Sequence, residues 1–203
     1  MTAANCLPIP RSRNTWRTER RSINSLTRIA VLPEVIMLSA KQVQELLNLQ
    51  PLRAEGGYFS EMYRSKFTLS RRSLPSGYSG ERAISTAIYY MLTSDTFSII
   101  HRLKGDEVYH FYLGDPAEML LLKPDGTGET VLLGQDIVSG MRLQQVVPAG
   151  VWQGSRLAPG GKFALMGTTM SPGFDPADFE IGVRDELSAR YPDYAALIAI
   201  LTR

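Results

Sequence analysis

Seven short segments with the composition of β-strands fill the chain between residues 83 and 169, and they constrain its fold more than any other feature. Each is rich in β-branched, aromatic or aliphatic residues and is bounded by glycine, proline, aspartate or serine, which favour turns. The segments span 83–92, 97–102, 107–113, 119–122, 130–133, 143–147 and 162–169. Helical segments do not alternate with them, so the pattern excludes a βαβ protein and favours a β-sandwich or a jelly-roll barrel.

A short helix is predicted on each side of this β-rich region. Ser39 and Gln42 have the spacing of a capping box, so a helix is expected to begin there and to end before Pro51. Near the C-terminus, apolar residues recur at i, i+3, i+4 and i+7 between Tyr194 and Leu201. We expect this second helix to pack on the outside of a sheet.

One domain is predicted over residues 37–203, because a chain of 203 residues with 44% apolar composition can bury one good core. Residues 1–36 contain six arginines against two glutamates, so the domain itself is slightly acidic although the whole chain has a net charge of +2. We interpret 1–36 as a disordered basic extension or an overlong start; its composition also leaves an organelle transit segment open.

Within the domain, the Gly-, Pro- and Ser-rich stretch 67–82 is expected to form a loop over a pocket mouth.

Composition also excludes several classes of partner. The domain has no cluster of Lys or Arg interleaved with aromatic residues, so no nucleic-acid partner is predicted. No apolar run approaches the roughly 20 residues needed to span a bilayer, so no membrane partner is predicted either. The single cysteine, Cys6, excludes an internal disulfide framework and fits a reducing compartment, from which we predict a cytoplasmic location.

The two histidines of the chain, His101 and His110, lie within one fourteen-residue stretch that also contains Glu107. Alternate side chains of a strand share a face, which groups Phe97 with His101 and Glu107 with Tyr109. If the turn at residues 104–106 folds the two strands into an antiparallel hairpin, His101 and Glu107 both face inward and His110 faces away. An imidazole beside a carboxylate is a workable general acid/base pair; a core histidine held by Glu107 is the structural alternative.

A second group of candidate ligand-binding residues follows the turn at 148–150. Trp152 could stack on a ring and Gln153 could hydrogen-bond to it, although Trp152 plugging the end of a barrel is an equal alternative. Gln144 and Gln145 are consecutive, so one of them should face inward and extend a polar lining. Arg64 and Arg102 are weaker candidates for pairing with an anionic ligand, because each is more simply explained as a surface or interface charge.

These residues fall on a pattern that resembles the cupin superfamily. On its first motif, G-x5-H-x-H-x3-E-x6-G, His101, Glu107 and Gly114 match, while Asp95 and Leu103 replace a Gly and a His. On its second, G-x5-P-x-G-x2-H-x3-N, Pro148 and Gly150 match, while Arg142, Gln153 and Leu157 replace Gly, His and Asn. The resemblance implies a mostly β fold, the double-stranded β-helix or cupin jelly roll, with short flanking helices at both ends.

Four further segments resemble the largely uncharacterised fifth cupin family in particular. They read E-G-G-Y-F (55–59), S-x-x-H-R-x-x-x-D-E (98–107), P-A-G-V-W-Q (148–153) and S-P-G-F-D-x-x-D-F-E (171–180). The resemblance covers residues 37–203. It implies a homodimer, because open sheet edges in this superfamily tend to pair between subunits.

The departures from the motifs bear on cofactors. Metal cupins offer three imidazoles and a carboxylate, whereas the four matching positions here hold His101, Leu103, Glu107 and Gln153. Glutamine is a poor ligand for transition metals, so we predict no cofactor. A metal-dependent enzyme remains a third reading, in which His101, Glu107 and Gln153 recruit an ion and waters complete its shell.

The resemblance to metal-free cupins suggests a function. The nucleotide-sugar 3,5-epimerases of this group use a histidine base and a tyrosine acid on opposite faces of the sugar. We therefore predict a pocket for a small polar, sugar- or nucleotide-sugar-like ligand, with His101 as base in an isomerase or epimerase and Glu107 orienting it. Tyr109, Tyr90 and Tyr58 are the candidate acids or ligand contacts. The alternative is a non-catalytic small-molecule sensor or binding cupin.

Overall fold

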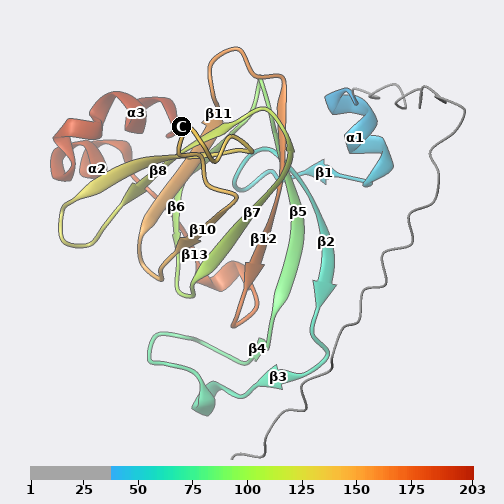
Figure 1. Cartoon of the computed structure of the whole chain (residues 1–203). Helices are drawn as coiled ribbons and strands as arrows, with labels where there is room; N and C mark the ends of the chain where they lie inside the picture. The colour runs from blue at the N-terminus through green and yellow to red at the C-terminus, as the bar shows by residue number, and fades with distance from the viewer. Residues whose placement is uncertain (1–37) are drawn as a thin grey trace, which may run out of the picture. The chain divides into compact units, whose positions relative to one another are not determined.

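The computed structural model describes residues 38–203, which fold into two antiparallel β-sheets with short helices outside them (Figure 1). One sheet has six strands in the order β1-β2-β5-β12-β7-β10, the other has five in the order β13-β6-β11-β8-β9, and β3 pairs with β4 alone. The strands are β1 (Gln50–Pro51), β2 (Tyr58–Arg64), β3 (Thr68–Leu69), β4 (Arg82–Ala83), β5 (Thr86–Thr93), β6 (Phe97–Leu103), β7 (Glu107–Gly114), β8 (Ala117–Leu122), β9 (Gly128–Leu133), β10 (Gln144–Val147), β11 (Trp152–Leu157), β12 (Phe163–Met170) and β13 (Phe179–Ile181). The helices are α1 (Ala40–Leu46), α2 (Arg184–Arg190) and α3 (Ala195–Ile200), with 3-10 turns η1 (Arg71–Ser73), η2 (Pro176–Asp178) and η3 (Pro192–Tyr194).

The basic extension predicted for residues 1–36 lies outside the described residues and stays a prediction. Within residues 38–203, none of the helices has the length and apolar character needed to cross a membrane.

The main core lies between the two sheets. Along β7, Glu107, Tyr109 and Phe111 are buried and alternate with more exposed side chains, the period of two that a half-buried strand requires. Tyr109 and Phe111 pack in one cluster with apolar side chains of the five-stranded sheet, including Met119 and Leu133. The mostly β, jelly-roll fold predicted from the sequence is therefore confirmed.

The outer faces of the sheets are covered by the helices. Ile100 and Trp152 of the five-stranded sheet pack against Leu187 of α2 and Ile198 of α3. On the six-stranded sheet, Val43 of α1 packs in a cluster with residues of β5 and β12. Ser39 caps α1 through the capping box expected from the sequence, and the C-terminal helical region lies outside a sheet as expected.

Two strand predictions need correction. The segment 83–92 is divided between β4 and β5, and β11, in the middle of the five-stranded sheet, was missed. β11 contains Gln153, Gly154 and Ser155, so it lacks the apolar alternation that marks a strand. Its glycine is required because a Cβ on Gly154 would lie 2.9 Å from the Ile100 side chain of the neighbouring β6.

The predicted hairpin between β6 and β7 is also wrong. β6 pairs with β11 and β13, whereas β7 pairs with β10 and β12 in the other sheet. The turn at residues 104–106 therefore carries the chain from one sheet to the other. Side chains that face inward from β6 and from β7 meet across the space between the sheets, rather than side by side on one of them.

A β-bulge in β6 changes which residues share a face with His101. Between the pairs Gln153↔His101 and Ser155↔Ser98, β6 advances by one residue more than β11. Ser98 and His101 are consequently both on the inner face. Phe97, predicted to share the face of His101, instead packs with the C-terminal helices on the outside.

The chain before β2 passes very close to the start of β6. Gly56 has a φ of +113°, and a Cβ at this position would overlap with the carbonyl oxygen of Phe97. One residue earlier, the carbonyl oxygen of Glu55 accepts a hydrogen bond of 2.9 Å from the backbone N–H of Ile99. The glycine therefore allows the backbone approach that fixes Glu55 against the five-stranded sheet.

We expect Gly56→Ala to destabilise the fold by several kcal/mol, because it combines a left-handed φ with a backbone clash. The matched control is Gly126→Ala, where φ is +92° and a Cβ would meet nothing within 4 Å. Strain alone predicts a loss of about 1–2 kcal/mol at Gly126. Urea unfolding of the two variants measures the difference, and equal losses would contradict the close-approach argument.

Candidate functional site

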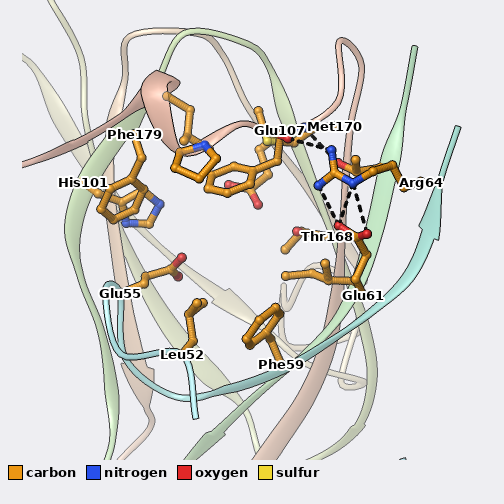
Figure 2. Close-up of a pocket in the computed structure, with 15 residues that line it drawn as sticks. Leu52, Glu55, Phe59, Glu61, Arg64, His101, Glu107, Thr168, Met170 and Phe179 are labelled. Carbon is orange, nitrogen blue, oxygen red and sulfur yellow. Dashed lines mark hydrogen bonds and ion pairs between the residues drawn. The ribbon is translucent and has the colours of Figure 1, made fainter. Parts of the chain in front are cut away.

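A cavity of about 220 Å³ opens between the sheets and is lined by both of them (Figure 2). Its walls are largely apolar, with a small set of polar side chains, as in ligand pockets generally. The apolar lining residues are Leu52, Phe59, Ile88, Leu103, Met170, Phe174, Pro176 and Phe179. The polar ones are Glu55, Glu61, Arg64, Thr86, His101, Glu107 and Thr168.

His101 is 1% exposed and lines this cavity from β6. Its Nδ1 lies 2.8 Å from the carbonyl oxygen of Ile99. A carbonyl can only accept, so Nδ1 carries a hydrogen, and in the neutral imidazole Nε2 keeps its lone pair. The Phe179 ring stacks on the imidazole at 4.8 Å between centroids. Nε2 has no hydrogen-bond partner among residues 38–203, and the ring faces the cavity in Figure 2.

Glu107 faces the same cavity from β7, on the opposite sheet, and is 7% exposed. Its Oε2 accepts a hydrogen bond of 2.7 Å from Nε2 of Gln153, which lies on β11. Burial, followed by the negative charge of Glu55, raises the pKa of Glu107; His101 and hydrogen bonds from Thr168 and Gln153 oppose this shift. The sequence prediction that His101, Glu107 and Gln153 lie close together agrees with this placement.

Glu55 is a pocket residue that sequence reasoning did not select. Its Oε1 accepts a hydrogen bond of 2.7 Å from the Ser98 hydroxyl, and its carboxylate points into the cavity below His101 (Figure 2). The available signal was the E-G-G-Y-F segment, because paired glycines directly after an acidic residue indicate a backbone path that holds that residue in place. Phe59, two residues after Gly57, forms part of the apolar wall.

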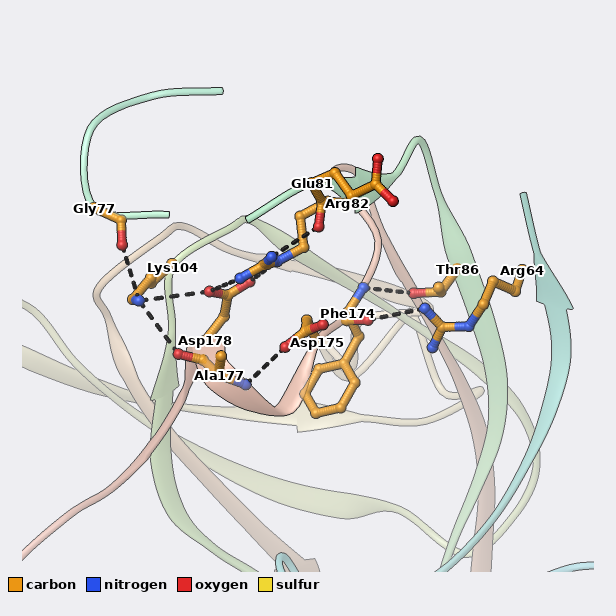
Figure 3. Close-up of polar contacts among 10 residues, drawn as sticks. All are labelled: Arg64, Gly77, Glu81, Arg82, Thr86, Lys104, Phe174, Asp175, Ala177 and Asp178. Carbon is orange, nitrogen blue, oxygen red and sulfur yellow. Dashed lines mark hydrogen bonds and ion pairs between the residues drawn. The ribbon is translucent and has the colours of Figure 1, made fainter. Parts of the chain in front are cut away.

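The exposed end of the cavity is bridged by Arg64. This side chain forms a bidentate ion pair with Glu61, the shortest contact being 2.7 Å, and its Nη1 donates to the carbonyl oxygen of Phe174 at 3.1 Å. Glu61 and Arg64 both lie on β2, whereas Phe174 belongs to the segment that follows β12. Arg64 therefore links the two sides of the mouth; Figure 2 shows its ion pair with Glu61, and Figure 3 shows its contact with Phe174.

The segment carrying Phe174 and Phe179 is held from outside by a buried ion pair. Arg82 donates from Nε and Nη2 to the two carboxylate oxygens of Asp178 at 2.6 and 2.8 Å, and both side chains are less than 5% exposed (Figure 3). Lys104 lies 3.5 Å from the same carboxylate. Arg82 ends the stretch 67–82, which contributes no lining residue; the expected loop over the mouth instead braces one wall from behind.

Two of the three candidate tyrosines lie in the core next to the pocket. Tyr90 and Tyr109 are 1% and 2% exposed, and Tyr90 donates its hydroxyl to the carbonyl oxygen of Gly56. Burial raises the pKa of both phenols well above the usual value, with a further contribution from nearby carboxylates. Neither is a lining residue of the cavity.

Three other predicted contacts lie away from the cavity, and these placements correct the sequence model. Tyr58 packs on the outer face of the six-stranded sheet, because its neighbour Phe59 takes the inner face. Trp152 packs against the C-terminal helices, with the Arg102 guanidinium 4.4 Å from its ring centroid. Gln144 is exposed and donates to Nδ1 of His110, which faces outward as predicted.

The donor set does not fit a transition-metal site. At the positions where the cupin motifs supply three imidazoles and a carboxylate, His101 and Glu107 are the good ligands that line the cavity; Leu103 cannot bind a metal, and Glu107 is already bonded to the Gln153 amide. Residues 38–203 contain no group of three or more His, Cys, Asp or Glu side chains placed to hold an ion.

Two facing sheets with a pocket between them define a cupin-like jelly roll, and comparison with known proteins identifies the family. The model of the family described as Cupin superfamily (DUF985) matches residues 41–182. The chain belongs to this family, which confirms the resemblance found in the sequence.

The chain is also similar to individual known proteins. The chain is 33% identical over 171 residues to an uncharacterised protein of Saccharomyces cerevisiae, covering 78% of this chain and 85% of that protein. A hypothetical protein from Leishmania major has a similar structure, with a TM-score of 0.72, 31% identity and coverage of 81% of this chain and 99% of its own. A crystal structure from Shewanella oneidensis gives a TM-score of 0.71 and 32% identity, with coverage of 82% and 99%.

We expect Arg82→Ala to lower the free energy of unfolding by about 3 kcal/mol, because it leaves Asp178 buried with Lys104 as its remaining cation. Arg102→Ala is the matched control. Arg102 makes the same bidentate contact with Glu180, but both side chains are exposed, so we expect a loss of about 1–2 kcal/mol including its stacking on Trp152. Urea unfolding distinguishes the two, and a smaller loss for Arg82→Ala would argue against a structural role for the buried pair.

Glu107→Gln should stabilise the protein relative to the wild type increasingly as pH rises. The pKa of Glu107 is higher in the folded protein than in the unfolded chain, where it is about 4.3. Protonation of Glu107 therefore stabilises the fold; this stabilisation is fully present below the unfolded pKa and is lost as pH rises through the folded pKa. The measurement is the melting temperature of both proteins across this range, with Glu45→Gln on exposed α1 as control. A difference that stays constant or shrinks with rising pH would show that Glu107 is not destabilised by burial.

Proposed function

We propose that the cavity between the sheets binds a small polar, sugar-like ring. The observation that carries this proposal is the orientation of His101: a buried imidazole is fixed through Nδ1 and directs its unpaired Nε2 toward a cavity that also contains two carboxylates. A histidine satisfied within a core would use both ring nitrogens. Phe59, Phe174 and Phe179 supply flat apolar surfaces of the kind on which a sugar ring stacks.

The volume restricts the ligand further. The cavity volume of about 220 Å³ is smaller than that of typical ligand pockets, which enclose about 300–1,000 Å³. One six-membered ring suits this space. If the ligand is a nucleotide sugar, the sugar ring occupies the cavity and the nucleotide lies beyond Arg64.

The reaction that suits this arrangement is proton transfer at a carbon next to a carbonyl, as in an isomerase or epimerase. Nε2 of His101 removes the proton, and the imidazolium that forms is stabilised by the charge of Glu107 across the cavity. Tyr109 and Tyr90 are close enough to Glu107 and Glu55 for these carboxylates to raise the pKa values of both phenols. Their raised pKa values keep them protonated, as an acid requires, but their burial behind the wall weakens this role.

We also propose a homodimer in a cytoplasmic setting. β1 pairs only with Tyr58 and Phe59, so among the described residues the edge of β2 from Ser60 onward has no neighbouring strand. Met62 and Tyr63 on this strand are more than half exposed. An open edge with exposed apolar side chains favours pairing with a second copy, and light scattering in solution measures the mass directly.

The proposal is tested by solvent exchange in a panel of keto sugars in deuterated water, followed by proton NMR. We expect deuterium incorporation next to the carbonyl of a bound sugar and a loss of about 10²-fold or more in His101→Asn. His110→Asn is the matched control, because it removes the outward-facing histidine and should leave the exchange rate unchanged.

The outcomes separate two functions. Binding, seen as a shift in melting temperature, together with exchange that depends on His101 supports an isomerase. Binding that His101→Asn weakens, without exchange, supports the non-catalytic binding protein. Absence of binding across the panel would refute the sugar-like ligand.

A further inference from the structure

The inner part of the cavity is acidic. Glu55 and Glu107 both line it, one from each side, and His101 is the one basic side chain close to them. Among the described lining residues, the permanently charged cation is Arg64. It lies at the exposed end, where its charge is paired with Glu61 and its Nη1 donates to the Phe174 carbonyl. A ligand inside the cavity therefore meets two carboxylates without a free guanidinium or ammonium group.

The Glu55 carboxylate is fixed in position. The Ser98 hydroxyl holds Oε1 at 2.7 Å, the Ile99 N–H holds the backbone carbonyl, and Gly56 keeps the chain against β6. These contacts hold the backbone of Glu55 at two points and its carboxylate at one, and they direct the carboxylate into the cavity. A fixed acceptor gives specificity as well as affinity.

The walls around these carboxylates are largely apolar. The rings of Phe59, Phe174 and Phe179 line the cavity, and Phe179 stacks on the His101 imidazole. An anion meets repulsion from two carboxylates in a space with little water to screen it. The unpartnered Nε2 of buried His101 shows that this space is built to receive a polar group.

We propose that Glu55 determines the ligand class: the site takes a small ring that carries a hydrogen-bond donor beside Glu55, binds a protonated amine more tightly than a hydroxyl, and excludes anionic rings. This inference rests on the proposed function, since it specifies the ligand of the same cavity. It also places any phosphate of a natural ligand outside the enclosed space.

The test uses three probes with one scaffold and three charges: glucosamine, glucose and glucuronate. Titration calorimetry at slightly acidic pH, where the amine is protonated and the uronic acid ionised, should give an order of affinity of glucosamine, glucose, then glucuronate, with at least tenfold between the first and last. A parallel series of cyclohexylamine, cyclohexanol and cyclohexanecarboxylate repeats the comparison without the other hydroxyls.

Glu55→Gln keeps the shape and removes the charge. We expect it to reduce the preference for glucosamine over glucose by about tenfold while glucose binding persists, which also shows that the pocket is intact. Glu118→Gln is the control, because Glu118 pairs with Arg156 away from the cavity and should leave the preference unchanged.

Each result decides a different point. Glucuronate binding as tightly as glucose, or an unchanged preference in Glu55→Gln, would overturn the role of Glu55 and leave the sugar-binding proposal standing. If the sugars fail to bind but the cyclohexyl series follows the expected order, the charge selection stands and the sugar-like ligand is wrong. If neither series binds, both proposals fail.

Discussion

The hydrogen bond between Gln153 and Glu107 is the interaction around which the site is organised, because it joins the two sheets inside the barrel. Gln153 lies on β11 of the five-stranded sheet and Glu107 on β7 of the six-stranded sheet. A carboxylate this deeply buried needs a partner, and the amide supplies one without adding a compensating charge. Burial still raises the pKa of Glu107, although the hydrogen bond from Gln153 works against this shift, and the carboxylate lines the cavity together with His101.

Much of the fold could be predicted from the sequence, since hydrophobic periodicity and turn residues are local signals. They located seven strands between residues 83 and 169 and the capped helix α1, and the cupin class followed from motif spacing. β11 was missed because its inward side chains, Gln153 and Ser155, are polar, and Gln153 bonds to Glu107 of the site. A strand that contributes polar groups to a buried site loses the pattern by which strands are recognised.

The candidate site was less predictable because it depends on which sheet each strand joins. Spacing alone indicated that His101 and Glu107 would approach each other, but suggested a hairpin; the chain crosses between sheets instead. The bulge in β6 likewise reversed the face assigned to Phe97. Glu55 and the aromatic wall arrive from segments distant in sequence, so no local pattern groups them with His101. Tyr58, Trp152 and Gln144 were misplaced for the same reason, since strand alternation gives a face only when the register is known.

The Arg64 bridge closes the exposed end of the cavity with contacts of unequal strength. Glu61 and Arg64 lie on the same strand, so their ion pair can move as a unit, and the two sides of the mouth are joined through the contact of Arg64 with the Phe174 carbonyl. This hydrogen bond is made to a neutral acceptor at a solvent-exposed position, so it stabilises the bridged arrangement by on the order of 1 kcal/mol. This contact is separate from the hydrogen bonds of both sheets and from the buried ion pair of Arg82 and Asp178. One exposed hydrogen bond therefore joins the two sides of the mouth, whereas a buried bidentate ion pair braces the segment that carries Phe174.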